Sequence, residues 1–247
     1  MNNVYINLCK INGFKKLLNA GKHNLRLIDT EIGIHKGGKI EPSRSHLNQV
    51  LEGPSTPEEI ENLAKNLIGK NVTKKLRKDA VLAVEIIFSP KAGFSMDFND
   101  FFEDCLEWTK SFYKLPILSA ISHFDEPAPH LHVLMLPLVG NRMIGSSIVG
   151  YKGKLKYSRD DFFKQLATKY QLIQYVRPEN FSPEQREAIA KSVIYKLFSL
   201  EGMGTWNIKD LMSVLKPNPF PVAQALGIEV PQSMRSQYIE SLIRGGL

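Results

Sequence analysis

The strongest constraint on the fold is a pair of apolar, β-favouring runs separated by a short, turn-rich connection. The runs are Ile117–His123 and Leu131–Leu138, and residues 124–129 between them contain two prolines, an aspartate and a glutamate. Two short strands joined by so few residues pair as an antiparallel hairpin. We therefore expect a sheet in which this hairpin is the best-defined part.

Other segments predict a mixture of strands and amphipathic helices around the hairpin. Val4–Leu8 indicates a short strand and Ala80–Phe88 a buried central strand. Thr56-Pro57-Glu58-Glu59 is a capping box followed by apolar residues at helical spacing. The apolar stripe of Phe98–Phe112 indicates a second helix. The expected class is α+β.

Two basic segments are expected to be irregular. Lys10–Arg26 is punctuated by glycine and only weakly periodic, which predicts a loop or a broken helix over a site. Gly150–Tyr157 predicts a flexible cationic loop, with Ser158 capping the helix that follows.

The pattern changes in the last third of the chain to helices with short connections. We place a boundary near Val176, with a main domain at residues 1–176 and a helical C-terminal region of unknown role at 177–247. The expected helical segments are Pro183–Leu200, Ile208–Leu215, a short turn at Val222–Leu226, and Pro231–Arg244.

Three of the six histidines fall within ten residues on the hairpin. His130 and His132 project from the same face of a strand, about 6.5–7 Å apart. If residues 124–129 form the loop, His123 lies across from His130 on that face. Three imidazoles from two rigid strands predict a metal site with positions left open for water or substrate.

Imidazole ligands suit manganese and the later transition metals better than magnesium, although availability in the cell can decide which ion is used. We expect Mn²⁺ or Mg²⁺. Glu126 in the loop could orient a ligand, take up a proton or act as a fourth ligand, and Asp125 is the alternative carboxylate. A metal with open positions favours a phosphate substrate, because it neutralises charge developing on a phosphoryl oxygen.

Composition indicates the partner and the compartment. The formal net charge of +7 favours a polyanion such as nucleic acid. Cys9 and Cys105 are too far apart for a Cys-x-x-Cys motif and suggest a reducing cytoplasm. Neither a secretory leader nor an apolar run of about 18 residues is apparent, so membrane insertion is not expected.

The chain resembles the MobV (Mob/Pre, plasmid recombination) relaxases, part of the wider HUH endonuclease group. Four segments carry the resemblance, and the last is the most specific, with the pattern His-x-Asp-Glu-x-x-Pro-His-x-His. They are Lys22-His23-Asn24-Leu25-Arg26, Pro42-Ser43-Arg44-Ser45-His46-Leu47-Asn48, Arg77-Lys78-Asp79-Ala80-Val81-Leu82, and His123–His132.

The resemblance implies an antiparallel sheet of about five strands with packed helices. It also implies metal-dependent nicking and rejoining of single-stranded or supercoiled DNA at an origin of transfer, through an enzyme joined covalently to the 5′ end. His23 would be the nucleophile, since a neutral imidazole attacks phosphorus without first losing a proton. Arg26 could hold the scissile phosphate. The residues expected to contact DNA are Lys22, Asn24, Arg44, Arg77, Lys78, Lys152 and Lys154.

Several alternatives remain open at this point. A tyrosine could be the nucleophile, and Tyr5, Tyr151 and Tyr157 are candidates. The chain could be a rolling-circle replication initiator, a metal-dependent phosphodiesterase without a covalent intermediate, or an origin-binding protein without activity. A relaxase could also have accessory mobilisation proteins or a coupling protein as partners.

Overall fold

The computed structural model describes residues 4–28, 40–90, 96–150, 152–172, 181–200 and 207–228. The chain divides into two compact units, one formed by residues 2–172 and the other by the residues from 173 on. The predicted boundary at Val176, the predicted helix Pro231–Arg244 and Tyr151 lie outside the described residues. In the described part, no helix is long and apolar enough to cross a membrane.

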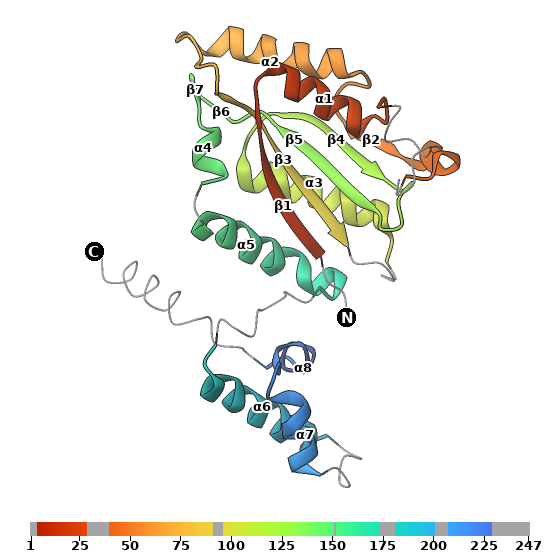
Figure 1. Ribbon diagram of the computed structural model, residues 1–247, viewed down its shortest axis with the longest axis vertical. Coiled ribbons are helices and arrows are strands. Elements are labelled where there is room, and N and C mark those ends of the chain that lie inside the picture. The colour runs from red at the N-terminus through yellow and green to blue at the C-terminus, as the bar shows by residue number, and fades with distance from the viewer. Residues whose placement is uncertain are drawn as a thin grey trace, which may run out of the picture. The chain divides into compact units, whose positions relative to one another are not determined.

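The first unit is built on a five-stranded antiparallel sheet (Figure 1). Its strands are ordered β1-β3-β5-β4-β2. The predicted α+β fold is confirmed, with strand bounds β1 Val4–Asn12, β2 Gln49–Glu52, β3 Val81–Pro90, β4 Ile117–His123 and β5 His130–Met135. The run predicted to continue to Leu138 instead ends at Met135, and Leu138 belongs to a small hairpin of β6 (Leu138–Val139) and β7 (Arg142–Met143).

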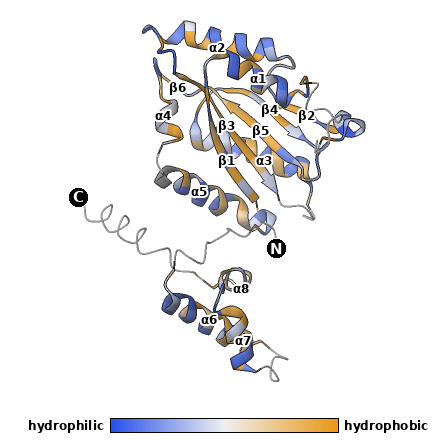
Figure 2. Cartoon of the chain, viewed as in Figure 1, coloured by the Kyte–Doolittle hydropathy of each residue, from blue (hydrophilic) through white to orange (hydrophobic). Residues whose placement is uncertain are grey.

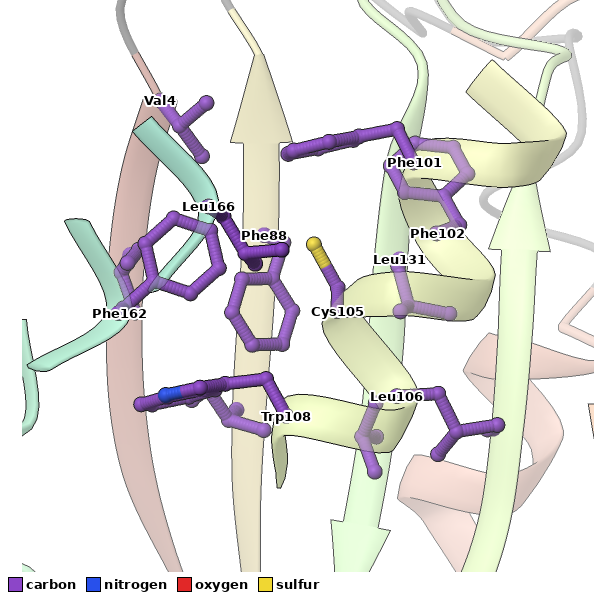
Figure 3. Packing of buried hydrophobic residues seen from close by; sticks show 14 of the residues in the cluster. Val4, Phe88, Phe101, Phe102, Cys105, Leu106, Trp108, Leu131, Phe162 and Leu166 are labelled. Atoms are coloured by element: carbon purple, nitrogen blue, oxygen red, sulfur yellow. The ribbon is translucent and has the colours of Figure 1, made fainter. Parts of the chain in front are cut away.

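Helices cover both faces of the sheet. One face packs against α3 (Phe98–Tyr113) and α5 (Lys152–Tyr170), and Figure 3 shows Phe88 of the sheet among Cys105, Trp108 and Phe162. The other face packs against α1 (Phe14–Asn24) and α2 (Pro57–Asn71) through a separate apolar cluster. Side chains that alternate along a strand therefore enter different cores, which explains why the central strands are apolar on both faces.

The helices begin where local chemistry predicts. Thr56 accepts a hydrogen bond from the backbone N–H of Glu59 at the start of α2, and Asp97 caps α3 in the same way. Figure 2 shows α2 with a hydrophilic outer side and apolar residues toward the sheet. Two short helices lie in the connections, the 3₁₀ helix η1 (Pro42–Leu47) before β2 and α4 (Gly145–Ile148) after β7.

Two sequence predictions about irregular segments were wrong. Residues 10–24 are the end of β1 followed by α1, because the strand continues to Asn12 by pairing with β3 and Gly13, with φ of 80°, permits the turn into the helix. The predicted cationic loop is also helical, since α5 begins at Lys152 and contains Ser158 in its interior. In both cases pairing and packing supplied order that the weak local pattern did not indicate.

Within the residues that the structure describes, the second unit contains three helices around an apolar core. These are α6 (Pro183–Phe198), α7 (Ile208–Leu215) and α8 (Phe220–Ala225). Ser182 and Gln185 form a reciprocal capping box at the start of α6. Phe181, Ala190 and Phe220 belong to the core. The helices predicted in this region are therefore present as far as the structure describes it.

Candidate metal centre

The predicted hairpin brings His123, His130 and His132 together on the face of the sheet that α1 also covers. His123 pairs directly with His130 across the β4–β5 hairpin, as the six-residue connection predicted. The three rings are buried, and their centroids lie 4.8–4.9 Å from one another. One nitrogen from each ring lies within 4.8 Å of the others. The three side chains could therefore hold one ion.

The hydrogen bonds around the rings determine which nitrogens are available. The Nε2 atom of His123 lies 2.7 Å from the carbonyl oxygen of Asn24, and Nδ1 of His130 lies 3.0 Å from that of Ala128. Because a carbonyl oxygen only accepts, each of these nitrogens carries the proton. The remaining nitrogens, Nδ1 of His123 and Nε2 of His130, lie 3.1 Å apart with a lone pair on each.

The third ring follows the same rule. Nδ1 of His132 donates to a carboxylate oxygen of Glu85 at 2.9 Å, which leaves Nε2 unprotonated. Each imidazole thus has its outer N–H held by an oxygen, the arrangement usual for metal-binding histidines. Lone pairs facing one another at 3.1 Å repel unless a cation lies between them. The donor set therefore fits a divalent transition metal such as manganese.

Burial favours the neutral form of two of these imidazoles. Burial, together with the neighbouring His132 and Arg26, lowers the pKa of His123 to about 2. Burial also lowers the pKa of His130. Neutral imidazole is the form that binds metal, so protons do not compete for His123 and His130 near neutral pH.

The C-terminal end of α1 brings the predicted nucleophile to this centre. The ring of His23 lies 5.5 Å from that of His132 and 6.3 Å from that of His123, centroid to centroid. His23 is in the last turn of the helix, half-buried beside the three histidines. The segment Lys22–Arg26 and the segment His123–His132 thus meet at the cluster of histidines.

Arg26 binds the loop of the β4–β5 hairpin through the carboxylates of Asp125 and Glu126. Its guanidinium donates to both oxygens of Asp125, at 3.0 and 2.7 Å, and to Glu126 at 2.8 Å. Arg26 has φ of 57°, just beyond the helix end, which turns its side chain back over the site. Glu126 in turn lies 3.7 Å from Nε2 of His130. Glu126 is therefore close enough to the centre to support or extend the ligand set.

Asp125 is fully buried and connects three segments of the chain. Besides Arg26 it accepts hydrogen bonds from Ser45 at 2.8 Å and Asn48 at 2.7 Å. Although burial raises the pKa of this carboxyl, the hydrogen bonds from Arg26, Asn48 and Ser45 hold it well below its usual range. The segment around η1 therefore supports the loop.

Glu85 is the residue that the sequence reasoning missed. Its carboxylate accepts from His132 and, at 3.1 Å, from the side-chain amide of Asn24. Burial raises its pKa, but the hydrogen bond and charge of His132 outweigh that effect and bring the pKa below its ordinary value. A signal was present, because Glu85 is the one charged residue of the apolar strand Val81–Pro90. A buried charge in such a strand needs a partner.

The predicted DNA contacts fall into three groups. Lys22 and Arg44 are half-buried on α1 and η1, and each adjoins in sequence a residue of the site, His23 and Ser45 respectively. Asn24 is only 1% exposed and bonded to Glu85, so it supports the histidines and does not face solvent.

The second and third groups lie away from the histidines. Arg77 and Lys78 are exposed and precede β3, whose first residue, Val81, is six residues from Ile87, the partner of His132; six residues of strand span roughly 20 Å. Lys152 and Lys154 lie in the first turn of α5, which packs on the opposite face, and their side chains are outside the described residues. The structure does not bring these four residues to the centre.

The fold is similar to that of relaxase domains of known structure. A relaxase domain of MobM, solved with manganese and the origin-of-transfer DNA of plasmid pMV158, superposes with a TM-score of 0.60 at 26% identity, over 68% of this chain and 86% of that one. A further structure of MobM with a 26-nucleotide DNA agrees in fold, with a TM-score of 0.55 at 19% identity.

The family model of the plasmid recombination enzymes (Mob_Pre) matches residues 1–174, and the chain belongs to this family. The resemblance inferred from the four segments is thereby confirmed. A plasmid recombination enzyme of Streptococcus agalactiae is 30% identical over 150 residues, and a type 3 enzyme of Staphylococcus aureus is 27% identical over 144. The matched regions cover 58% and 55% of this chain but only 29% and 35% of those relatives.

Proposed function

We propose that the chain nicks and rejoins one DNA strand at an origin of transfer, with His23 as the nucleophile and His123, His130 and His132 as the ligands of a divalent metal, Mn²⁺ or Mg²⁺. The observation that carries the proposal is the position of His23, whose ring lies 5.5 Å from a member of the buried triad. MobM, a relative of similar fold, was solved with both manganese and origin DNA.

When bound, the metal supplies a Lewis acid that neutralises charge developing on the phosphate. The protein contributes the rest. Glu85 and the carbonyl oxygens of Asn24 and Ala128 orient the imidazoles. Arg26 positions Glu126, and its buried Nη1 has no hydrogen-bond partner within the described residues, which leaves the two N–H groups of that nitrogen for a phosphate oxygen.

The proposed reaction is a transesterification. A ring nitrogen of His23 forms a bond to phosphorus while the bond from phosphorus to the 3′ oxygen breaks. The electron pair of that bond leaves with the 3′ oxygen, which takes up a proton to give a 3′-hydroxyl, and the attacking ring loses its other N–H proton. Rejoining reverses these steps, so no nucleotide cofactor is needed.

The proposed substrate is single-stranded DNA, presented by a supercoiled origin. The net charge of +7 favours such a polyanion. Lys22 and Arg44 are the predicted phosphate contacts nearest the centre, whereas Arg77, Lys78, Lys152 and Lys154 would bind DNA further from it. Accessory mobilisation proteins or a coupling protein would be partners of the assembled complex.

The test is nicking of an oligonucleotide that carries the origin of the element encoding this chain, with Mn²⁺ present and the products separated on a denaturing gel. The native chain is compared with His23→Ala and with His46→Ala, since His46 is an exposed histidine of η1. We expect a covalent adduct with the native chain and the His46→Ala control, and none with His23→Ala.

Other outcomes would change the assignment. An adduct that persists in His23→Ala would move the nucleophile to a tyrosine. Metal-dependent cleavage without an adduct, even after rapid quenching, would indicate a hydrolytic phosphodiesterase. Cleavage that is unchanged after removal of metal with a chelator would contradict the role proposed for the three histidines.

A further inference from the structure

The sheet face that carries the histidines continues past the end of α1 as a strip without charged side chains. The strip consists of Tyr5 and Asn7 on β1 and of Ile87 and Ser89 on β3. Even-numbered residues at this end of the two strands, which include Val4, Ile6 and Phe88, pack into the core on the opposite face of the sheet. Residues 5, 7, 87 and 89 therefore point to the histidine side.

The strand register connects the strip directly to the metal centre. Asn7 pairs with Ile87 on β3, and Ile87 pairs with His132 on β5, so these three residues form one row across the sheet. Tyr5 pairs with Ser89, one side-chain level further toward the end of the sheet. Since neighbouring strands lie about 4.8 Å apart, β1 is about 10 Å from β5.

Tyr5 is the conspicuous residue of this strip. Its side chain is 65% exposed, whereas Asn7, Ile87 and Ser89 are half-buried around it. A large ring standing on a flat, uncharged sheet surface offers a π-face to a planar ligand. Glu85, the nearest acid along β3, is bonded to His132 and Asn24 and presents no free charge to the strip.

We infer that Tyr5 is a stacking platform for a base of the DNA strand whose phosphate lies at the metal centre. The inference rests on the proposed function. A separation of about 10 Å corresponds to roughly three stacked nucleotides at 3.4 Å each, or fewer when the strand is extended. The small polar side chains Asn7 and Ser89 leave room beside the ring, and the phosphates remain on the side of α1 and η1.

The inference also assigns a role to a tyrosine that the sequence left open as a nucleophile. Stacking uses the ring and does not require the hydroxyl. Tyr5→Phe should therefore preserve both DNA binding and adduct formation, whereas Tyr5→Ala should weaken binding. A nucleophilic Tyr5 would give the opposite result for Tyr5→Phe, which would retain binding and lose the adduct.

The experiment measures the Kd of a fluorescein-labelled 20-nucleotide oligothymidylate by anisotropy at fixed, low salt, since stacking on an aromatic ring tolerates any base. The chains compared are native, Tyr5→Ala, Tyr5→Phe and Tyr195→Ala. Tyr195 is the matched control, being an 82% exposed tyrosine of α6 in the second unit. Thermal unfolding of each variant reports whether it is folded.

We expect the Kd to rise about 5- to 150-fold for Tyr5→Ala, the range expected when one stacked base is lost. Tyr5→Phe and Tyr195→Ala should stay within about twofold of native. A folded Tyr5→Ala that binds like the native chain would overturn the inference, as would an equal loss in Tyr195→Ala. Adduct formation by the native chain on origin DNA tests the proposed function separately, so one can fail while the other stands.

Discussion

Replacing Glu85 by alanine should weaken metal binding although Glu85 is not itself one of the three histidine ligands. Its Oε1 atom accepts from Nδ1 of His132 at 2.9 Å and from Nδ2 of Asn24 at 3.1 Å. Without this acceptor the His132 ring loses both its fixed tautomer and its orientation. Removal of such an outer partner commonly lowers metal affinity about 10- to 100-fold, which corresponds to roughly 1.4–2.7 kcal/mol.

The same substitution should also lower the stability of the metal-free chain. Asn24 is 1% exposed, so its amide would lose its acceptor in a place that water does not reach. An unsatisfied buried group of this kind costs about 1–3 kcal/mol of unfolding free energy. Glu85→Gln keeps an oxygen of similar position but no charge, so its effect on metal affinity should be intermediate.

Isothermal titration with Mn²⁺ measures the affinity, and chemical denaturation in a chelator measures the stability. Glu52→Ala is a suitable control, because Glu52 pairs with Lys110 of α3 on the opposite face of the sheet. If Glu85→Ala stays folded and binds Mn²⁺ as tightly as the native chain, the reasoning about ligand orientation is wrong.

Two further predictions concern stability. Gly53→Ala should destabilise the chain by several kcal/mol, since Gly53 has φ of +94° and an added Cβ would lie 2.4 Å from the carbonyl oxygen of Leu118. Gly69 lies inside α2, and nothing lies within 4 Å of a Cβ added there, so Gly69→Ala should instead stabilise the chain by up to about 1 kcal/mol. Similar denaturation midpoints for Gly53→Ala and Gly69→Ala would contradict this contrast. Asp104 has a pKa below its ordinary value, because the hydrogen bond from Lys169 and its other partners outweigh the opposing effect of burial. The contribution of Asp104 to the free energy of unfolding is therefore present above the ordinary carboxyl pKa and is lost as the pH falls through the lowered value. In Asp104→Asn, the free energy of unfolding should consequently fall less steeply with decreasing pH than in the native chain. An unchanged slope on the acid side would refute this.

Local chemistry was enough to predict much of the sheet. The β4–β5 hairpin followed from two apolar runs and a six-residue connection, and the pairing of His123 with His130 followed from the length of that connection. The helix start at Thr56 was predicted from its capping box. These features depend on residues close together in the chain, where spacing alone limits the geometry.

Other features were not visible in local patterns. The edge strand β2 is only four residues long and forms by pairing with β4, so the sequence around it gave no periodic signal. The segment at the start of α5 was predicted to be a loop because it is basic and contains glycine, yet it is helical. Helices of this kind are stabilised by packing more than by propensity.

By itself, then, the sequence determined the chemistry of the centre: three imidazoles at strand spacing, a fourth histidine, an arginine and two loop carboxylates. Only the tertiary structure decided which of these groups act together. The tertiary structure places His23 beside the three histidines. It pairs Arg26 with Asp125 and Glu126, about a hundred residues later in the chain. It also shows that Glu85 accepts a hydrogen bond from His132 and so orients its ring. The physical reason is that spacing governs contacts within an element, whereas contacts between distant segments are selected by burial, which requires each enclosed charge to find a partner.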